Sequence, residues 1–109
     1  MAGSVVRAAG FTDVPVLAYP GRCGISSIRY VNGDVGTRFC QVFDAASVSD
    51  VTIGTTEPTW VLVAGANGQD DNLKAPAVFE KGVVVAGTTT ATGNTGAGAG
   101  TQFLRMALV

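Results

Sequence analysis

Short runs of β-branched, aromatic and aliphatic residues alternate with glycine, proline and asparagine along the whole chain. No stretch shows the 3.6-residue spacing of an amphipathic helix, whereas several runs suit short strands between turns. Proline restricts two of these runs to an edge strand or a crossing segment. The segments that we expect to be extended are residues 13–20, 25–31, 38–43, 59–64, 73–81, 82–90 and 101–109.

The regular spacing of these runs predicts an all-β fold, a single small β-sandwich or jelly-roll-like barrel of about six to eight short antiparallel strands. At 109 residues the chain is long enough for one core and too short for two. Residues 1–12 combine small residues with no clear period. We expect them to form an extended N-terminal arm, either frayed or ordered against a partner or the domain flank. Residues 13–109 would then form the sandwich domain.

The strongest turn signal is Asn-Gly within residues 32–36, because these residues accept positive φ. It predicts that residues 25–31 and 38–43 pair as a hairpin. In that register Cys23 would lie about 16 Å from Cys40 along the strands, at ~3.3 Å per residue. A disulfide requires Cα atoms within about 7 Å, so we expect two free, partly buried thiols, in agreement with a reducing compartment.

The strand over residues 38–43 is apolar on both faces. Phe39 and Phe43 point to one side, and Cys40 and Val42 point to the other. Such a strand belongs between a sandwich core and either a second layer or a neighbouring subunit. The expected core residues are Phe39, Phe43, Trp60, Val83, Val85 and Phe103. The candidate assembly-interface residues are Val5, Val6, Phe11, Cys40 and Val42.

Three further positions carry local expectations. Asp44 should cap a turn by accepting hydrogen bonds from its own downstream backbone. The irregular stretch over residues 45–58 should place Val48, Val51 and Ile53 in the core, while its serine and threonine residues stay hydrated. Gly87, inside a strand, indicates either a bulge or a close backbone approach.

Composition narrows the possible partners. Charged residues make up 14% of the chain, against about 25% in typical soluble domains. Either threonine, serine, glycine and asparagine supply part of the polar surface, or copies of the chain or a partner cover much of it. The formal net charge is −1, and the seven basic residues occur singly in the sequence. We therefore expect no nucleic-acid binding, which requires a basic patch. No apolar run approaches the ~20 residues of a membrane span, and the N-terminus has no apolar stretch of signal-peptide length.

Candidate chemistry is sparse. The chain has no histidine, the commonest general base and transition-metal ligand. Cys23 and Cys40 form no CxxC pair, and the acidic loop over residues 67–72 lacks the order of a calcium loop. The glycine-rich residues 93–100 lack the GK[ST] ending of a phosphate loop and suit a hairpin tip. We expect no enzyme activity, no catalytic residues, no cofactor and no metal.

Three segments carry a resemblance to a known group of proteins. They are FDAA at residues 43–46, Thr-Glu-Pro at residues 56–58, and FEKGVVVAGTTT at residues 79–90. Over residues 25–109 the chain resembles small β-rich virion structural proteins of tailed bacteriophages. The resemblance implies a capsid decoration (cement) protein that bridges capsomers of the major capsid protein lattice. It also implies a homo-oligomer, with a trimer expected, and a place in the virion after assembly in the host cytoplasm.

An alternative within the same group is a tail or fibre adhesin domain that binds cell-surface glycans. Its groove would be lined by the aromatic residues Trp60, Tyr30 and Tyr19.

Overall fold

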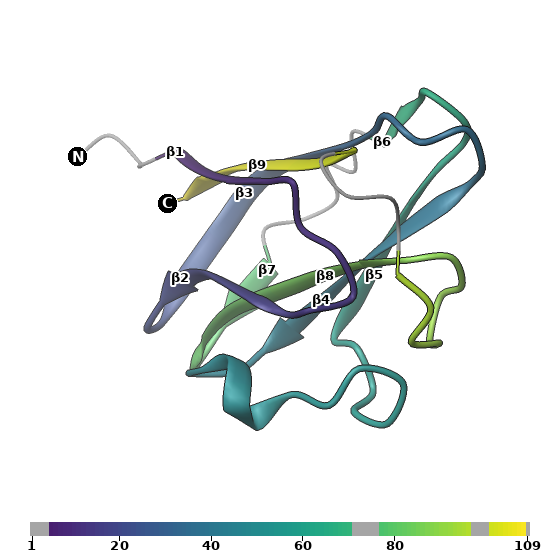
Figure 1. Ribbon diagram of the computed structural model, residues 1–109. Coiled ribbons are helices and arrows are strands. Elements are labelled where there is room, and N and C mark those ends of the chain that lie inside the picture. The colour runs from purple at the N-terminus through teal and green to yellow at the C-terminus, as the bar shows by residue number, and fades with distance from the viewer. Residues whose placement is uncertain (1–4, 71–76, 97–100, 109) are drawn as a thin grey trace.

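The computed structural model describes residues 5–70, 77–96 and 101–108 and shows an all-β sandwich (Figure 1). Extended structure follows from the β-branched and aromatic content of the strands and from the glycine-rich turns between them. The predicted extended segment over residues 73–81 is described from Ala77 onward; residues 73–76, like 1–4 of the predicted arm and 97–100 of the glycine-rich loop, lie outside the described residues. The strands are β1 (Val5–Ala9), β2 (Val16–Pro20), β3 (Cys23–Asn32), β4 (Arg38–Asp44), β5 (Trp60–Ala64), β6 (Gln69–Asp70), β7 (Ala77–Phe79), β8 (Gly82–Thr88) and β9 (Gln102–Leu108).

Two antiparallel sheets face each other. Sheet A has the order β1-β9-β3-β6, with β7 also paired to β3, and sheet B has the order β2-β8-β4-β5. The chain changes sheet after β1, β2, β3, β5, β7 and β8, and β4 and β5 pair with each other within sheet B. This is the connectivity of a jelly roll, two interleaved Greek keys. The predicted fold class is confirmed.

The predicted hairpin between residues 25–31 and 38–43 is wrong. Both segments are strands, but β3 lies in sheet A and β4 lies in sheet B. The Asn-Gly turn is present, and the backbone N–H of Asp34 donates to Asn32 Oδ1 at 3.0 Å. However, Asn32 Nδ2 also donates to the carbonyl oxygens of Ala64 and Gly65, at 3.2 and 3.0 Å, next to β5. These bonds hold the turn against the opposite sheet, so it links the layers.

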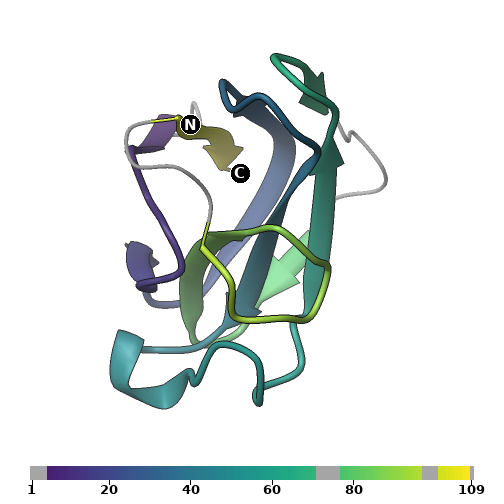
Figure 2. The same cartoon turned by 45° about the vertical axis from the view of Figure 1, so that its right-hand side comes forward.

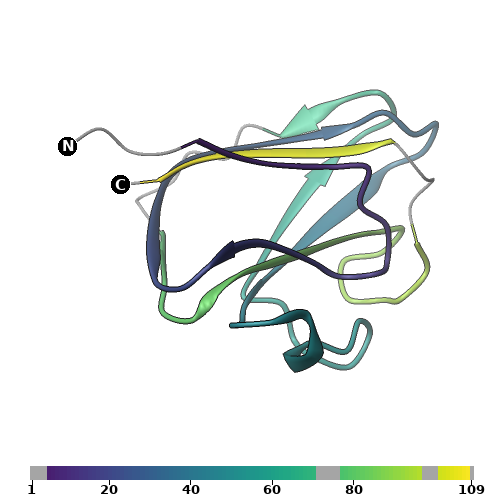
Figure 3. The ribbon, with the colours of Figure 1, turned by 60° about the vertical axis from the view of Figure 1, so that its left-hand side comes forward.

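Residues 5–9 form β1, a strand of the sandwich. β1 pairs with β9 from Val5↔Ala107 to Ala9↔Phe103 and forms one edge of sheet A. Figure 3 shows β1 lying along β9 before the chain turns towards β2, which lies beside β8. We expected residues 1–12 to be either frayed or ordered against a partner or the domain flank. Residues 5–9 are ordered against the domain flank. Phe11, two residues after β1, is buried in the core.

The sandwich core is formed by the inward residues of both sheets. On β4 these are Cys40 and Val42, both 0% exposed, and on β8 they are Val83 and Val85. The outward face of β4 carries Phe43, which packs with Ala45, Val51 and Val84 in a second cluster. The second layer over sheet B is therefore supplied by the chain's own loop over residues 45–58.

This loop follows part of its prediction. Val51 is buried and Ile53 packs against the second cluster, but on the outer face of sheet B and not in the sandwich core. Val48 is 41% exposed because it lies in the short 3-10 helix η1 (Val48–Asp50), so its predicted burial is wrong. Figure 2 shows the loops after β4 and after β8 on the same side of the molecule, where Gly54 lies against Asn94.

Polar side chains are enclosed between the sheets near Gly87. A Cβ at Gly87 would lie 3.0 Å from Cγ of Gln102, and the register with β4 continues through Cys40↔Gly87. The glycine thus reflects a close approach and not a bulge. Gln102 Oε1 accepts a hydrogen bond from the Tyr30 hydroxyl, and Gln102 Nε2 donates to Asn32 Oδ1 at 2.9 Å. Burial of these polar groups is offset by their mutual hydrogen bonds.

Candidate functional site

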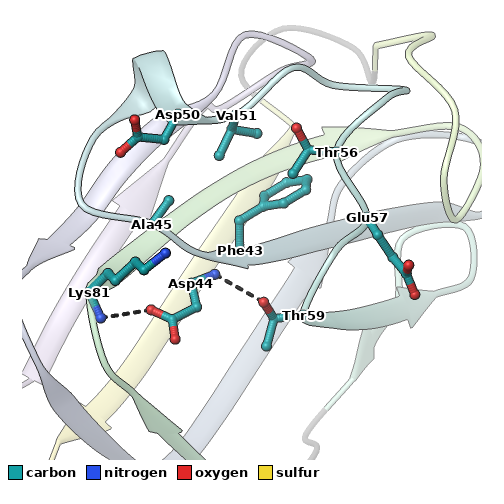
Figure 4. A pocket seen from close by; sticks show the side chains of 9 residues that line it. All are labelled: Phe43, Asp44, Ala45, Asp50, Val51, Thr56, Glu57, Thr59 and Lys81. Atoms are coloured by element: carbon teal, nitrogen blue, oxygen red, sulfur yellow. Dashed lines mark hydrogen bonds between the residues drawn. The ribbon is translucent and has the colours of Figure 1, made fainter.

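A pocket of about 530 Å³ lies on the outer side of sheet B, below the loop over residues 45–58 (Figure 4). Its apolar part comes from the second cluster, which places Phe43, Ala45 and Val51 along the wall. The loop keeps its shape through threonine hydrogen bonds, including Thr52 N–H to Thr56 Oγ1 at 2.9 Å. The remaining lining residues are Asp44, Asp50, Thr56, Glu57, Thr59 and Lys81.

Asp44 is the most constrained charged group of this pocket. Its carboxylate accepts backbone N–H bonds from Glu80 at 3.0 Å, Lys81 at 2.8 Å and Gly82 at 3.4 Å. Burial by itself would raise the pKa of Asp44. The three backbone N–H groups and the charge of Lys81 outweigh burial, and they hold the pKa below its ordinary value of 3.8. Asp44 does cap a turn, as expected, but the turn is the β7–β8 connection and not its own downstream backbone.

The pocket has both apolar and charged lining residues. Its carboxylates are Asp44, which is occupied by backbone donors, and the exposed Asp50 and Glu57. Within the described residues, no group of three or more His, Cys, Asp or Glu side chains is placed to hold a metal ion. No helix in the described part of the chain is long and apolar enough to span a membrane. The pocket lies where the loop over residues 45–58 meets the outer face of sheet B.

The predicted interface residues are mostly interior. Cys40 and Val42 line the sandwich core, and Phe11 is buried there as well, so an interface role for these three is contradicted. Val6 packs against the same core, while Val5 is 51% exposed and remains available. The prediction failed because the alternation of apolar residues divides a strand into two faces without showing which face is inside.

Some of the predicted core residues lie in the sandwich core, and others lie on the outer faces of the sheets. Val83 and Val85 lie in the sandwich core, and Trp60 packs against it while partly exposed. Phe43 is buried in the second cluster, outside the sandwich core. Phe39 and Phe103 are half-buried on the outer faces of the two sheets, so placing them in the core was wrong.

Both cysteines are free and buried, as expected. Burial raises the pKa of the Cys40 thiol strongly. It also raises the pKa of the Cys23 thiol, to which the charge of Asp44 adds. The separation argued from a hairpin register does not apply, because β3 and β4 lie in different sheets.

The aromatic groove of the glycan-binding alternative is not formed by its three expected members. Tyr30 is 0% exposed and its hydroxyl is bonded to Gln102. Trp60 and Tyr19 pack against the sandwich core. The rings of Trp60 and Tyr19 are therefore partly covered by core side chains. The ring of Tyr30 is buried, so a sugar could not stack on it.

One surface feature was missed by reading the basic residues as isolated. Arg7 of β1 pairs with Arg105 of β9, and Arg105 pairs in turn with Arg29 of β3. The three side chains are exposed and form a row across the outer face of sheet A. The row depends on strand pairing between segments that are distant in sequence, which residue types alone do not indicate.

Comparison of the chain with known protein families, with curated proteins and with solved structures finds no match.

Proposed function

We propose that the chain is a non-enzymatic virion structural protein of a tailed bacteriophage. Its role would be that of a capsid decoration (cement) protein, which stabilises the head shell by bridging capsomers of the major capsid protein as a homo-oligomer. It would assemble in the host cytoplasm and reside in the virion. A trimer follows from the resemblance. Many weak contacts made together would give firm attachment to the lattice.

One observation carries this proposal: the segments of the resemblance, far apart in sequence, meet in one place. Asp44 of the FDAA segment bonds the backbone of residues 80–82, which belong to the FEKG segment. The backbone N–H of Ala45 donates to the carbonyl oxygen of Gly82 at 3.2 Å. The resemblance therefore follows a structural unit of the jelly roll. Jelly rolls are common in viral capsid proteins, although lectins and cupins share the architecture.

Self-association is supported by the edge where β1 and β2 lie next to each other. Each is the outermost strand of its sheet. Exposed apolar side chains follow this edge and the turn before β2: Val5, Val14, Val16 and Leu17. An uncovered edge strand with apolar side chains is a template for pairing with another chain, and soluble proteins usually protect it. A second copy covering this edge would remove that exposure.

The test adds purified protein to capsid shells that assembled without it, and measures bound protein and the melting temperature of the shell. The proposal expects saturable binding by an oligomer and a higher shell melting temperature. Val16→Lys should give a monomer in sedimentation and weaken binding. Val35→Lys, which adds the same charge at an exposed valine in the turn between β3 and β4, should do neither. A wild-type chain that leaves the shells bare would overturn the proposal.

A further inference from the structure

The dipeptide Asn-Gly occurs twice in the chain, at residues 32–33 and 67–68. Asparagine is a thermolabile residue, and in this dipeptide it is especially reactive. The backbone nitrogen of the glycine can attack the side-chain amide carbon of the asparagine, and the glycine has no Cβ to hinder the approach. Because both sites have the same local sequence, any difference in their reactivity must come from the fold.

Asn32 is held by hydrogen bonds at both polar atoms of its side chain. Nδ2 donates to three backbone carbonyl oxygens, at 2.8, 3.2 and 3.0 Å. Oδ1 accepts from Gln102 Nε2 at 2.9 Å and from the backbone N–H of Asp34 at 3.0 Å. The N–H of Gly33, which would be the attacking group, donates to the carbonyl oxygen of Thr101 at 2.7 Å. Asn32 is 0% exposed, so a reaction there requires these bonds to break and water to enter.

Asn67 lies in the turn between β5 and β6 (Figure 1). Its φ is +51°, and one hydrogen bond, from the N–H of Gly68 to the carbonyl oxygen of Gly65 at 2.9 Å, closes the turn. The Asn67 side chain is exposed, and within the described part of the chain no hydrogen bond holds it. The attacking nitrogen is released when this single turn bond opens.

The two sites therefore differ in the opening that each requires. An exposed turn opens locally at low free-energy cost, whereas a residue bonded into the sandwich opens only with a larger unit. Asn32 is bonded to Ala64 of β5 in sheet B and to Gln102 of β9 in sheet A. Its exposure to water thus requires the two sheets to separate.

We propose that Asn67-Gly68 is a site of spontaneous deamidation and that the fold protects Asn32-Gly33. Hydroxide removes the proton from the Gly68 N–H, and the nitrogen attacks Cγ of Asn67. The new N–Cγ bond closes a succinimide ring, the Cγ–Nδ2 bond breaks, and Nδ2 leaves as ammonia with a proton taken from water. A water molecule then opens the ring at either of its carbonyl carbons, which gives aspartate or isoaspartate.

The product changes the turn in two ways. The new carboxylate makes the formal net charge of −1 more negative by one unit. Aspartate, like asparagine, accepts a positive φ and fits the turn. Isoaspartate instead carries the main chain through the former side chain and adds one backbone atom. The carbonyl oxygen of Gly68 accepts the N–H of Asn32 at 2.8 Å, so a longer backbone before it should weaken this contact with the end of β3.

The test incubates the full chain below its melting transition, in mildly alkaline buffer made with ¹⁸O-labelled water, and digests it afterwards in ordinary water. A side-chain or backbone carboxyl formed during the incubation carries the label, whereas one formed during digestion does not. Trypsin cleaves after Arg29, Arg38 and Lys74 and so places residues 32 and 67 in different peptides, which are analysed by mass spectrometry. The same incubation in guanidinium chloride gives the rates of the unfolded chain.

Release of ammonia is measured in parallel on wild type and two variants. Asn67→Asp removes the reactive amide and keeps a residue that accepts positive φ. Asn94→Asp is the matched control, because Asn94 is also exposed but precedes Thr95, whose branched side chain hinders the attack. Thermal unfolding shows that both variants keep the fold.

In the native chain we expect labelled aspartate and isoaspartate at residue 67, and conversion of residue 32 at least about tenfold slower. In guanidinium chloride the two sites should react at similar rates. Asn67→Asp should remove most of the ammonia released by the native chain, and Asn94→Asp should leave it unchanged. Equal native rates at residues 32 and 67 would overturn the inference. So would an unmodified residue 67 after a period in which the unfolded chain converts, or ammonia release that survives Asn67→Asp.

Discussion

Asp44 and Lys81, 37 residues apart, are joined by a hydrogen bond of 2.8 Å from the backbone N–H of Lys81 to Asp44 Oδ1. Oδ2 of the same carboxylate accepts the N–H of Glu80 at 3.0 Å. One side chain at the end of β4 thus closes the turn that leads into β8, the strand buried on both faces. The local order of sheet B depends on a polar contact between segments that are distant in sequence.

Replacing Asp44 by alanine should lower the free energy of unfolding by about 1–3 kcal/mol, because backbone donors of the turn lose a charged acceptor. The pKa of Asp44 is depressed in the folded state, so its contribution is complete above the ordinary value of 3.8 and is lost as the pH falls through the lower native value. Urea unfolding curves of wild type and Asp44→Ala should therefore differ near neutral pH and converge in acid.

Asp50→Ala is the matched control, since Asp50 lines the same pocket, but its exposed carboxylate accepts a long hydrogen bond, of 3.5 Å, from the Ser47 hydroxyl and not the backbone donors that Asp44 accepts. It should cost much less than Asp44→Ala near neutral pH. A difference between wild type and Asp44→Ala that stays constant into acid would contradict the charged-acceptor account.

Phe43 and Phe39 point to the same face of β4 but should contribute unequally to stability. Phe43 is 2% exposed beneath the loop over residues 45–58, whereas Phe39 is half-buried beside the exposed Val63. Phe43→Ala should cost about 3–5 kcal/mol, as for a buried ring that leaves a cavity. Phe39→Ala should cost about half as much or less, because part of its ring already contacts water. Equal losses in chemical denaturation would show that Phe39 is covered in solution.

Strand β4 shows which structural features could be predicted from the sequence and which could not. Its start at Arg38, its strand character and its two apolar faces followed from residue types, because β-branched and aromatic residues suit a pleated, buried surface; the strand ends one residue later than predicted, at Asp44. Which face is inside did not follow. Cys40 and Val42 are as compatible with an outer layer as Phe39 and Phe43 until it is known that residues 45–58 fold back over sheet B.

Strand pairing was the harder problem. The Asn-Gly turn after β3 gave the correct place for a reversal, but Asn32 side-chain bonds to Ala64 and Gly65 direct it across the sandwich. In a jelly roll most neighbours in a sheet are distant in sequence, as Arg7, Arg105 and Arg29 are. Local pattern carries no information about such pairs. For that reason the sequence predicted the fold class, whereas the arginine row and the partners of Asp44 required the structure.

Gly82 should be intolerant of a side chain. Its φ is +151°, and a Cβ there would lie 2.7 Å from the carbonyl oxygen of Ala45 and 2.9 Å from that of Tyr19. Both neighbours are backbone atoms of paired segments and cannot move away alone. Gly82→Ala should therefore lower stability by about 3 kcal/mol or more through strain and overpacking. Gly65→Ala, with no heavy atom within 4 Å of the added methyl group, is the control and should change the melting temperature little. A similar melting temperature for both variants would contradict this assignment.

Tyr30, Gln102 and Asn32 form a buried hydrogen-bonded cluster between the sheets, and removing the Tyr30 hydroxyl should lower stability. Tyr30→Phe removes the donor to Gln102 Oε1 and leaves that oxygen unpaired at a site with almost no solvent access. We expect a loss of about 1–3 kcal/mol in the free energy of unfolding. The double variant Tyr30→Phe with Gln102→Leu should recover part of it, because an apolar pair no longer needs hydrogen-bond partners. Additive losses in the double variant would argue against direct coupling.

The two free cysteines should be protected from thiol reagents by the fold. Reaction requires the thiolate, and burial raises the pKa of both Cys23 and Cys40 above the ordinary 9.0. In native buffer, labelling with Ellman's reagent should be slow for both and should follow global unfolding for Cys40, which is 0% exposed. The pKa of Cys40 is higher in the folded than in the unfolded chain, so the neutral buried thiol stabilises the fold fully below pH 9.0. Above pH 9.0 the thiol of the unfolded chain ionises first, and the free energy of unfolding falls as the pH rises further. Cys40→Ala should remove much of this alkaline loss of stability. Rapid labelling of Cys40 in the native state would mean that the two sheets separate locally far more often than a close-packed core allows.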